Sequence, residues 1–174
     1  MLLLPDPNQS ALPTLSNIAT CTPEVFGIQP CQWQLQVVEA IMKGGCNVLC
    51  IAGTGMGKTL TFWMPLLFLP AGIQIIITPL NLLGKQNVMS LVKAGIQAIS
   101  ISSEMATPAN FQAISTFQYR VGIISPKQLM QPEGGFEKLL KNPLFVLWII
   151  SIVIDEVHCL TEWGEFFPEY QELG

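Results

Sequence analysis

One short segment has the residue types and spacing needed to hold a phosphate chain. Residues 52–59 read Ala-Gly-Thr-Gly-Met-Gly-Lys-Thr, directly after the apolar run 48–51. Glycines let successive backbone N–H groups point at a phosphate, and a helix that follows adds its positive end. In such a loop Lys58 reaches the β- and γ-phosphates, and Thr59 offers its hydroxyl to Mg²⁺. A chance glycine turn before a helix is the alternative. The predicted phosphate loop consists of Ala52, Gly53, Thr54, Gly55, Met56, Gly57, Lys58 and Thr59.

A second segment ends an apolar run in two adjacent carboxylates. Residues 149–154 are apolar except for Ser151, and Asp155 and Glu156 follow at once. We expect Asp155 to hold Mg²⁺, directly or through water, and Glu156 to orient or deprotonate an attacking water. His158 is a candidate sensor of the γ-phosphate, or else a merely structural histidine. An exposed loop with two acids is the alternative for the pair, but the upstream phosphate loop favours ATP and Mg²⁺.

The elements that must position these segments alternate between helix and strand. We expect strands over residues 48–51, 73–78, 98–102, 121–124 and 149–154. We expect helices over residues 30–43, 58–69 (ended early by Pro65), 82–94 and 108–117, and from residue 136. Because the strands are unbroken apolar runs, the predicted fold class is α/β, with a parallel sheet covered by helices on both faces. Ligands of such sheets bind at the carboxyl ends of the strands, where both segments lie.

Composition narrows the class of protein. The 174 residues fit one domain, and with 50% hydrophobic and 11% charged residues the chain is not disordered. Its net charge is −4 and its eight Lys and Arg residues are scattered, so no basic patch binds nucleic acid by charge alone. The five cysteines lack metal-ligand spacing and suit a reducing compartment. The apolar run 144–154 is too short to cross a bilayer. We therefore expect an intracellular protein (nuclear in a eukaryote) without a membrane partner, and a flexible lead over residues 1–20.

The two segments resemble motifs of superfamily 2 helicases, and within them of RecQ-like DNA helicases. Residues 52–59 are similar to helicase motif I, and residues 155–158 (Asp-Glu-Val-His) to the DEAH form of motif II. Phe26-Gly27 followed by residues 30–34 resembles the segment in which a glutamine reads the adenine edge, which implies that role for Gln34. The resemblance covers about residues 22–174. It implies a P-loop RecA-like fold, ATP and Mg²⁺ as cofactors, and 3′–5′ DNA unwinding.

The resemblance also implies which residues contact single-stranded or partly duplex DNA. Residues 78–80 with Gln86 resemble motif Ia, and residues 125–127 resemble motif Ib, which touch DNA mostly through backbone groups. Residues 158–170 are similar to the aromatic-rich loop of RecQ enzymes, which stacks bases, although the loop is one residue shorter here and lacks a basic residue before Pro168. An aromatic cluster packed as core is the alternative. The implied nucleic-acid-binding residues are Pro79, Leu80, Gln86, Ser125, Pro126, Trp163, Phe166 and Phe167.

The family pattern also implies parts that this chain does not contain. Family helicases have two RecA-like domains, and the chain resembles most of the first. We therefore expect a domain over residues 21–174 that is truncated after motif II and the aromatic-rich loop. It would lack the motif III strand, which lies between the motif I and motif II strands, and the arginine finger of the second domain. Arg120 precedes the fourth strand and does not replace that finger. We expect marginal stability, no unwinding by the chain alone, and a partner that supplies the missing strand or domain.

Two other classes of function stay open at this point. The first is a non-catalytic nucleotide-binding module, a degenerate or truncated helicase that acts only through a partner. The second is a P-loop kinase or small GTPase, which is disfavoured because neither a phosphoryl-acceptor pocket nor an Asn-Lys-x-Asp guanine motif is visible.

Overall fold

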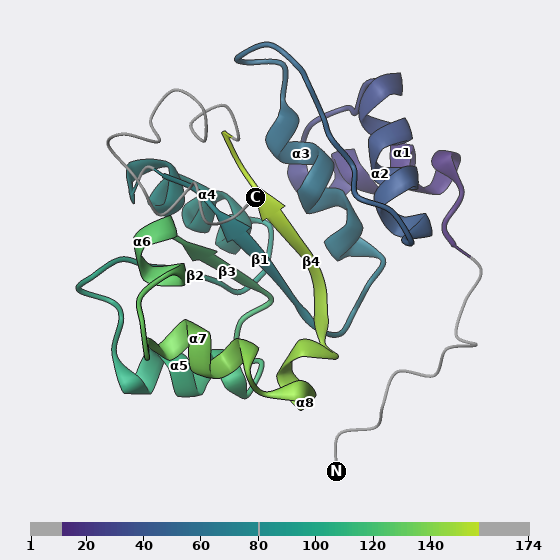
Figure 1. The fold of residues 1–174 in the computed structure, drawn as a ribbon. Helices are drawn as coiled ribbons and strands as arrows, with labels where there is room; N and C mark the ends of the chain where they lie inside the picture. The colour runs from purple at the N-terminus through teal and green to yellow at the C-terminus, as the bar shows by residue number, and fades with distance from the viewer. Residues whose placement is uncertain (1–11, 80, 157–174) are drawn as a thin grey trace. The chain divides into compact units, whose positions relative to one another are not determined.

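The computed structural model describes residues 12–79 and 81–156 of the chain. They divide into two compact units, with the boundary between Ala71 and Gly72 (Figure 1). The first unit is helical and carries the predicted phosphate loop, and the second contains a parallel sheet. The predicted α/β class is therefore confirmed. No helix in the described ranges is long and apolar enough to span a membrane.

The first unit packs three α-helices and a 3₁₀ helix around a small apolar core. The helices are α1 (Leu15–Phe26), α2 (Gln32–Lys43), α3 (Lys58–Trp63) and the 3₁₀ helix η1 (Met64–Leu67). Pro65 lies in the 3₁₀ turn, so the helix expected over residues 58–69 ends early, as proline requires. The core of this unit consists of Ile18, Leu35, Val38, Leu60 and Met64.

Helix α1 corrects the expectation of a flexible lead. Residues 15–20 of that predicted segment are helical, because Thr14 caps the helix and Ile18 joins the core. The Thr14 side chain accepts a hydrogen bond from the Asn17 backbone N–H at 3.2 Å, and Ile18 is only 1% exposed. Residues 1–11 lie outside the described part of the chain.

The prediction of a buried strand over residues 48–51 is wrong for this structure. The segment has no strand assignment, and the side chains of Leu49 and Ile51 are 73% and 89% exposed. A strand exists only where a neighbour completes its hydrogen bonds. None of the four described strands pairs with this segment, so its β-favouring composition is not sufficient.

The described part of the second unit contains four parallel strands. They are β1 (Ile73–Ile77), β2 (Ala98–Ile101), β3 (Val121–Ile124) and β4 (Ile149–Ile154). Figure 1 shows them side by side in the order β2-β3-β1-β4. The connecting segments contain α4 (Asn81–Lys93), α5 (Pro108–Ser115), α6 (Pro126–Leu129), α7 (Gly135–Leu140) and α8 (Pro143–Val146). These bounds agree with the predicted strands to within a residue.

The sheet buries apolar side chains on both of its faces. On one face Ile75, Ile99 and Ile124 pack with Phe136 of α7 and Phe145 of α8. On the other face α4 crosses closely over β2, since a Cβ built on Gly84 would lie 2.7 Å from the Ser100 hydroxyl oxygen. Among the described residues β4 is an edge strand of the sheet, and its Ile152 is 55% exposed.

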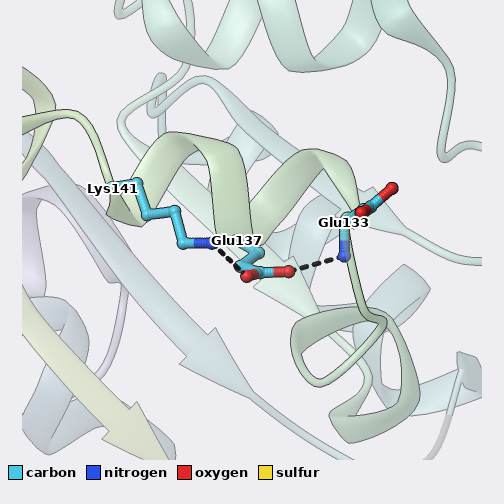
Figure 2. Close-up of polar contacts among 3 residues, drawn as sticks. All are labelled: Glu133, Glu137 and Lys141. Atoms are coloured by element: carbon cyan, nitrogen blue, oxygen red, sulfur yellow. Dashed lines mark hydrogen bonds and ion pairs between the residues drawn. The ribbon is translucent and has the colours of Figure 1, made fainter.

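A charged network stabilises the beginning of α7 (Figure 2). The Glu137 carboxylate accepts a hydrogen bond from the Lys141 ammonium, and another from the Glu133 backbone N–H at 2.6 Å. These contacts, the Lys141 hydrogen bond first, lower the pKa of Glu137. A lowered folded-state pKa stabilises the fold above the ordinary glutamate value, and this contribution is lost as the pH falls through the folded pKa.

We expect Glu137 to titrate below the ordinary glutamate value of about 4.3. A ¹³C NMR titration of its carboxyl group measures this directly. Lys141→Gln removes the ammonium and should return the midpoint towards the ordinary value. Lys93→Gln, in α4, is the control that should leave it unchanged. An identical midpoint in Lys141→Gln would show that the ion pair has no electrostatic consequence.

Candidate functional site

The predicted phosphate loop adopts a backbone that glycine makes accessible. Gly55 and Gly57 have φ angles of +79° and +78°, in the left-handed region that residues with a Cβ rarely adopt. Residues 53–57 are exposed, while Ala52, Lys58 and Thr59 are partly buried. The loop therefore presents backbone to solvent and is anchored at both of its ends.

Lys58 folds back over this loop. Its ammonium donates hydrogen bonds to the carbonyl oxygens of Ala52 at 2.8 Å and of Gly53 at 3.3 Å. The cation is thus held beside exposed loop backbone, at a place where an anion can reach it. If a phosphate bound there, the Lys58 ammonium would exchange neutral carbonyl acceptors for charged phosphate oxygens. Charged oxygens make stronger hydrogen bonds with an ammonium.

Gln34 connects the start of α2 to the same loop. The side chain is 4% exposed. Its carbonyl oxygen accepts from the Cys31 N–H at 2.7 Å, and its amide nitrogen donates to the Gly57 carbonyl at 2.9 Å. Sequence reasoning missed this supporting role, although the three-residue spacing from Cys31 is that of a capping box. The adenine-reading role of Gln34 stays a prediction.

The contact between Gln34 and Gly57 leads to a prediction about loop glycines. A Cβ on Gly57 would lie 2.8 Å from the Gln34 amide nitrogen, whereas one on Gly45 meets nothing within 4 Å. Both glycines have φ +78°. Gly57→Ala and Gly45→Ala should each cost about 1–2 kcal/mol of unfolding free energy from the left-handed backbone. Only Gly57→Ala should also displace Gln34 and weaken nucleotide binding.

Denaturant unfolding and nucleotide titration of the two variants measure these effects. Gly45→Ala is the matched control because it carries the same backbone penalty without the contact. Equal nucleotide affinity in both variants would contradict the proposed link between Gln34 and the loop.

In the second unit the structure brings other predicted residues to one edge of the sheet. The Asp155 N–H donates to the Ile77 carbonyl at 2.9 Å, and the Thr78 N–H donates to the Ile124 carbonyl at 3.0 Å. Because the strands are parallel, their carboxyl ends lie together at this edge. The predicted residues gathered there are Pro79, Ser125, Pro126, Asp155 and Glu156.

Local contacts set the conformation of several of these residues. The Ser125 hydroxyl caps α6 by accepting from the Gln128 N–H at 3.4 Å. Glu156 has a φ of +55°, and its N–H donates to Asp155 Oδ1 at 3.1 Å. A left-handed residue with a side chain costs about 1 kcal/mol, so the turn after β4 holds Glu156 in a sparsely populated conformation. No sequence signal indicated this.

Other predicted residues lie apart from this edge or outside the described chain. Gln86 is exposed on α4. Arg120 donates from Nε to the Gly72 carbonyl at 2.9 Å, at the amino end of β1 and so at the opposite end of the strands from Asp155. The predicted residues outside the described chain are Leu80, His158, Trp163, Phe166 and Phe167.

Comparison with known proteins shows which family the chain belongs to. Residues 31–174 match the model of the DEAD/DEAH box helicase family. The chain belongs to the DEAD/DEAH box helicases.

Within this family the chain is similar to RecQ-type helicases. It is 33% identical over 148 residues to ATP-dependent DNA helicase Q-like 4B of Arabidopsis thaliana, covering 81% of this chain and 12% of that protein. It is 29% identical over 157 residues to ATP-dependent DNA helicase Q5 of Rattus norvegicus (87% and 16%). It is 29% identical over 144 residues to ATP-dependent DNA helicase RecQ of Bacillus subtilis (80% and 23%). The chain therefore spans less than a quarter of these three relatives.

Among the described residues, no group of three or more His, Cys, Asp or Glu side chains lies together. Mg²⁺ in nucleotide sites is held by one or two protein oxygens together with phosphate oxygens and water. The Thr59 hydroxyl of the first unit and the Asp155 carboxylate of the second unit each carry an oxygen of the kind that Mg²⁺ binds.

An apolar hollow in the second unit does not fit a nucleotide. Its volume of about 530 Å³ suits a small ligand. The lining from β1 and β4 is aliphatic, and the charged pair Glu137 and Lys141 is already joined. A triphosphate would lose its hydration there and would find few donors, chiefly Gln131 and the Lys141 ammonium that already pairs with Glu137.

Proposed function

We propose that this chain is the ATP-binding and DNA-binding part of a RecQ-type, ATP-dependent 3′–5′ DNA helicase. The observation that carries the proposal is the Lys58 ammonium, which hydrogen-bonds the Ala52 and Gly53 carbonyls above an exposed glycine loop. Family membership supports ATP as the nucleotide, and the names of the relatives support DNA as the substrate.

Each residue of the two helicase motifs has a distinct role in this proposal. Lys58 and the backbone of residues 53–57 bind the phosphates, and Gln34 reads the adenine. The oxygen groups of Thr59 and Asp155 would hold Mg²⁺, which supplies charge neutralisation to the phosphates when bound. Glu156 orients or deprotonates the attacking water. The left-handed backbone conformation of Glu156 sets the direction in which its side chain leaves the turn. His158 senses the γ-phosphate.

DNA binding relies on positioning rather than on charge. The chain carries a net charge of −4, so long-range attraction to phosphates is weak. The carboxyl ends of the strands carry Pro79, Ser125 and Pro126. In this proposal the backbone groups there contact single-stranded DNA. Stacking on Trp163, Phe166 and Phe167 adds affinity without charge. We therefore expect weak binding by the chain alone, and no unwinding.

A non-catalytic nucleotide-binding module is the second candidate. It is favoured by segment 48–51, which leads directly into the phosphate loop and pairs with none of the described strands. In that case the chain binds a nucleotide and hydrolyses it only when a partner supplies the missing strand or second domain.

A two-part experiment separates the candidates. Titration with a fluorescent ATP analogue and Mg²⁺ measures nucleotide binding, and phosphate release is followed with single-stranded DNA or with RNA of equal length. Binding with DNA-stimulated release supports the helicase proposal. Binding without release supports the module. Stimulation by RNA instead of DNA would overturn the RecQ assignment, and no binding would overturn both candidates.

A further inference from the structure

The two strands that lead to the acidic edge are almost entirely aliphatic, with one polar residue each. Strand β1 reads Ile-Gln-Ile-Ile-Ile, and β4 reads Ile-Ile-Ser-Ile-Val-Ile. The polar residues Gln74 and Ser151 are direct partners across the two strands. The Gln74 amide nitrogen donates to the Ser151 hydroxyl at 2.9 Å, and the Gln74 side chain is completely buried.

The aliphatic residues of these strands define their register only weakly. Polar and apolar alternation normally fixes a register, because a slip moves apolar side chains into water. A slip of β4 that brings Ile149 opposite Gln74 would keep aliphatic pairs at Ile75 and Ile77, and would place Ser151 opposite Ile76. The opposite slip is already disfavoured, because it would bring the Asp155 carboxylate opposite the buried Ile76. The backbone hydrogen bonds of a parallel ladder also repeat every two residues.

The Gln74–Ser151 hydrogen bond does distinguish the registers. A two-residue slip in one direction would place the Gln74 amide opposite Val153, and a slip in the other direction would place it opposite Ile149. Neither side chain can accept its hydrogen bond. A buried amide without its partner lowers the population of a register by about fivefold to a hundredfold.

A local irregularity adds to the importance of this pair. Ile73 pairs with Ile149, but Gln74 pairs with Ser151, so the register shifts between them and Ile150 is the additional residue. The pairing before the irregularity therefore does not determine the pairing after it. The register that reaches Asp155 begins at the Gln74–Ser151 pair and continues through Ile77 and Ile154.

We propose that Gln74 and Ser151 are positioning residues whose hydrogen bond selects the register of β4 on β1 and thereby sets the place of Asp155 and Glu156. A two-residue slip would move this acidic pair by about 6.6 Å along the strand relative to the end of β1. The register claim stands on the contacts above, and its consequence for Mg²⁺ rests on the proposed function.

The test uses the full chain and a variant in which the polar requirement is removed from every register. In Gln74→Ile/Ser151→Val both strands are wholly aliphatic, so the sheet keeps its apolar character. Inter-strand amide NOEs report the register, because native pairing places Asp155 beside Ile77 and a slip places Val153 there. We expect one set of NOEs for the wild type, and additional sets of at least about a tenth of the intensity for the double variant.

The controls separate this effect from general destabilisation. Ile76→Val changes the same face of β1 without a polar group and should keep one register. Ser151→Thr keeps the hydroxyl and should also keep one register. If the double variant does not fold, Ser151→Ala provides the same measurement with a smaller change. A single native set of NOEs in the chain without the hydrogen bond overturns the proposal.

A second readout distinguishes failure of this inference from failure of the proposed function. The Mg²⁺ concentration needed for half-maximal binding of the ATP analogue should rise in the double variant by the factor by which the native register is depopulated, about tenfold if the native NOEs fall to a tenth, while binding without Mg²⁺ is unchanged. Additional registers with an unchanged Mg²⁺ midpoint would support the positioning role and overturn the metal role of Asp155. A single register overturns the positioning role whatever the midpoint.

Discussion

Lys58→Ala is expected to raise the dissociation constant for Mg²⁺-ATP by about a hundredfold or more. Hydrogen bonds to charged groups contribute about 1.5–3 kcal/mol each, and each 1.4 kcal/mol is a tenfold change in affinity. The Lys58 ammonium is the cation held against the loop carbonyls of Ala52 and Gly53. Titration with a fluorescent ATP analogue measures the loss.

Two control variants make this result specific. Lys43→Ala removes an exposed lysine of the same unit, which pairs with Glu39, and should leave the affinity unchanged. Lys58→Met keeps the length of the side chain and removes only the charge. It should lose binding as Lys58→Ala does, with a smaller change in melting temperature. Wild-type affinity in Lys58→Met would remove Lys58 from the phosphate site.

Glu156→Gln is expected to lower DNA-stimulated phosphate release by about 10²–10⁴-fold while nucleotide affinity stays within about twofold. A positioned general base contributes a factor of this size, and an amide cannot accept the proton of an attacking water. The substitution preserves side-chain size, so the left-handed turn after β4 should persist. Phosphate release at saturating nucleotide is the measurement.

Glu104→Gln is the control for this second result. Glu104 is an exposed carboxylate of the same unit, outside the sheet. It should keep wild-type phosphate release. If Glu156→Gln also kept it, Glu156 would not be the base, and residual hydrolysis would have to come from another group. Loss of nucleotide affinity in Glu156→Gln would instead indicate a binding role.

The parallel sheet of the second unit could be predicted because its strands have a local signature. Residues 73–77 and 121–124 are runs of mostly branched aliphatic residues; the first lies between Gly72 and Pro79, and the second is followed by Pro126. That composition suits a strand buried on both faces, and the helices between the strands require parallel crossovers. The left-handed angles of Gly55 and Gly57 also follow from residue type, because glycine adopts them without strain.

The segment 48–51 shows where this reasoning fails. Its Val-Leu-Cys-Ile sequence is as apolar as the true strands, yet Leu49 and Ile51 are exposed. Apolar composition can be read from one segment, but a β-strand forms only when a neighbouring segment completes its backbone hydrogen bonds. The missing partner could not be read from residues 48–51 themselves.

The sequence by itself determined the chemistry this protein offers: a glycine loop ending in Lys58 and Thr59, an acidic pair after an apolar strand, and an α/β class. These depend on residue type and on spacing along the chain. Only the tertiary structure decided that the Gln34 amide hydrogen-bonds the Gly57 carbonyl of the loop. It also decided that Gln74 hydrogen-bonds Ser151, which lies 77 residues further along the chain. Such contacts depend on register and packing between distant segments, and no local pattern encodes them.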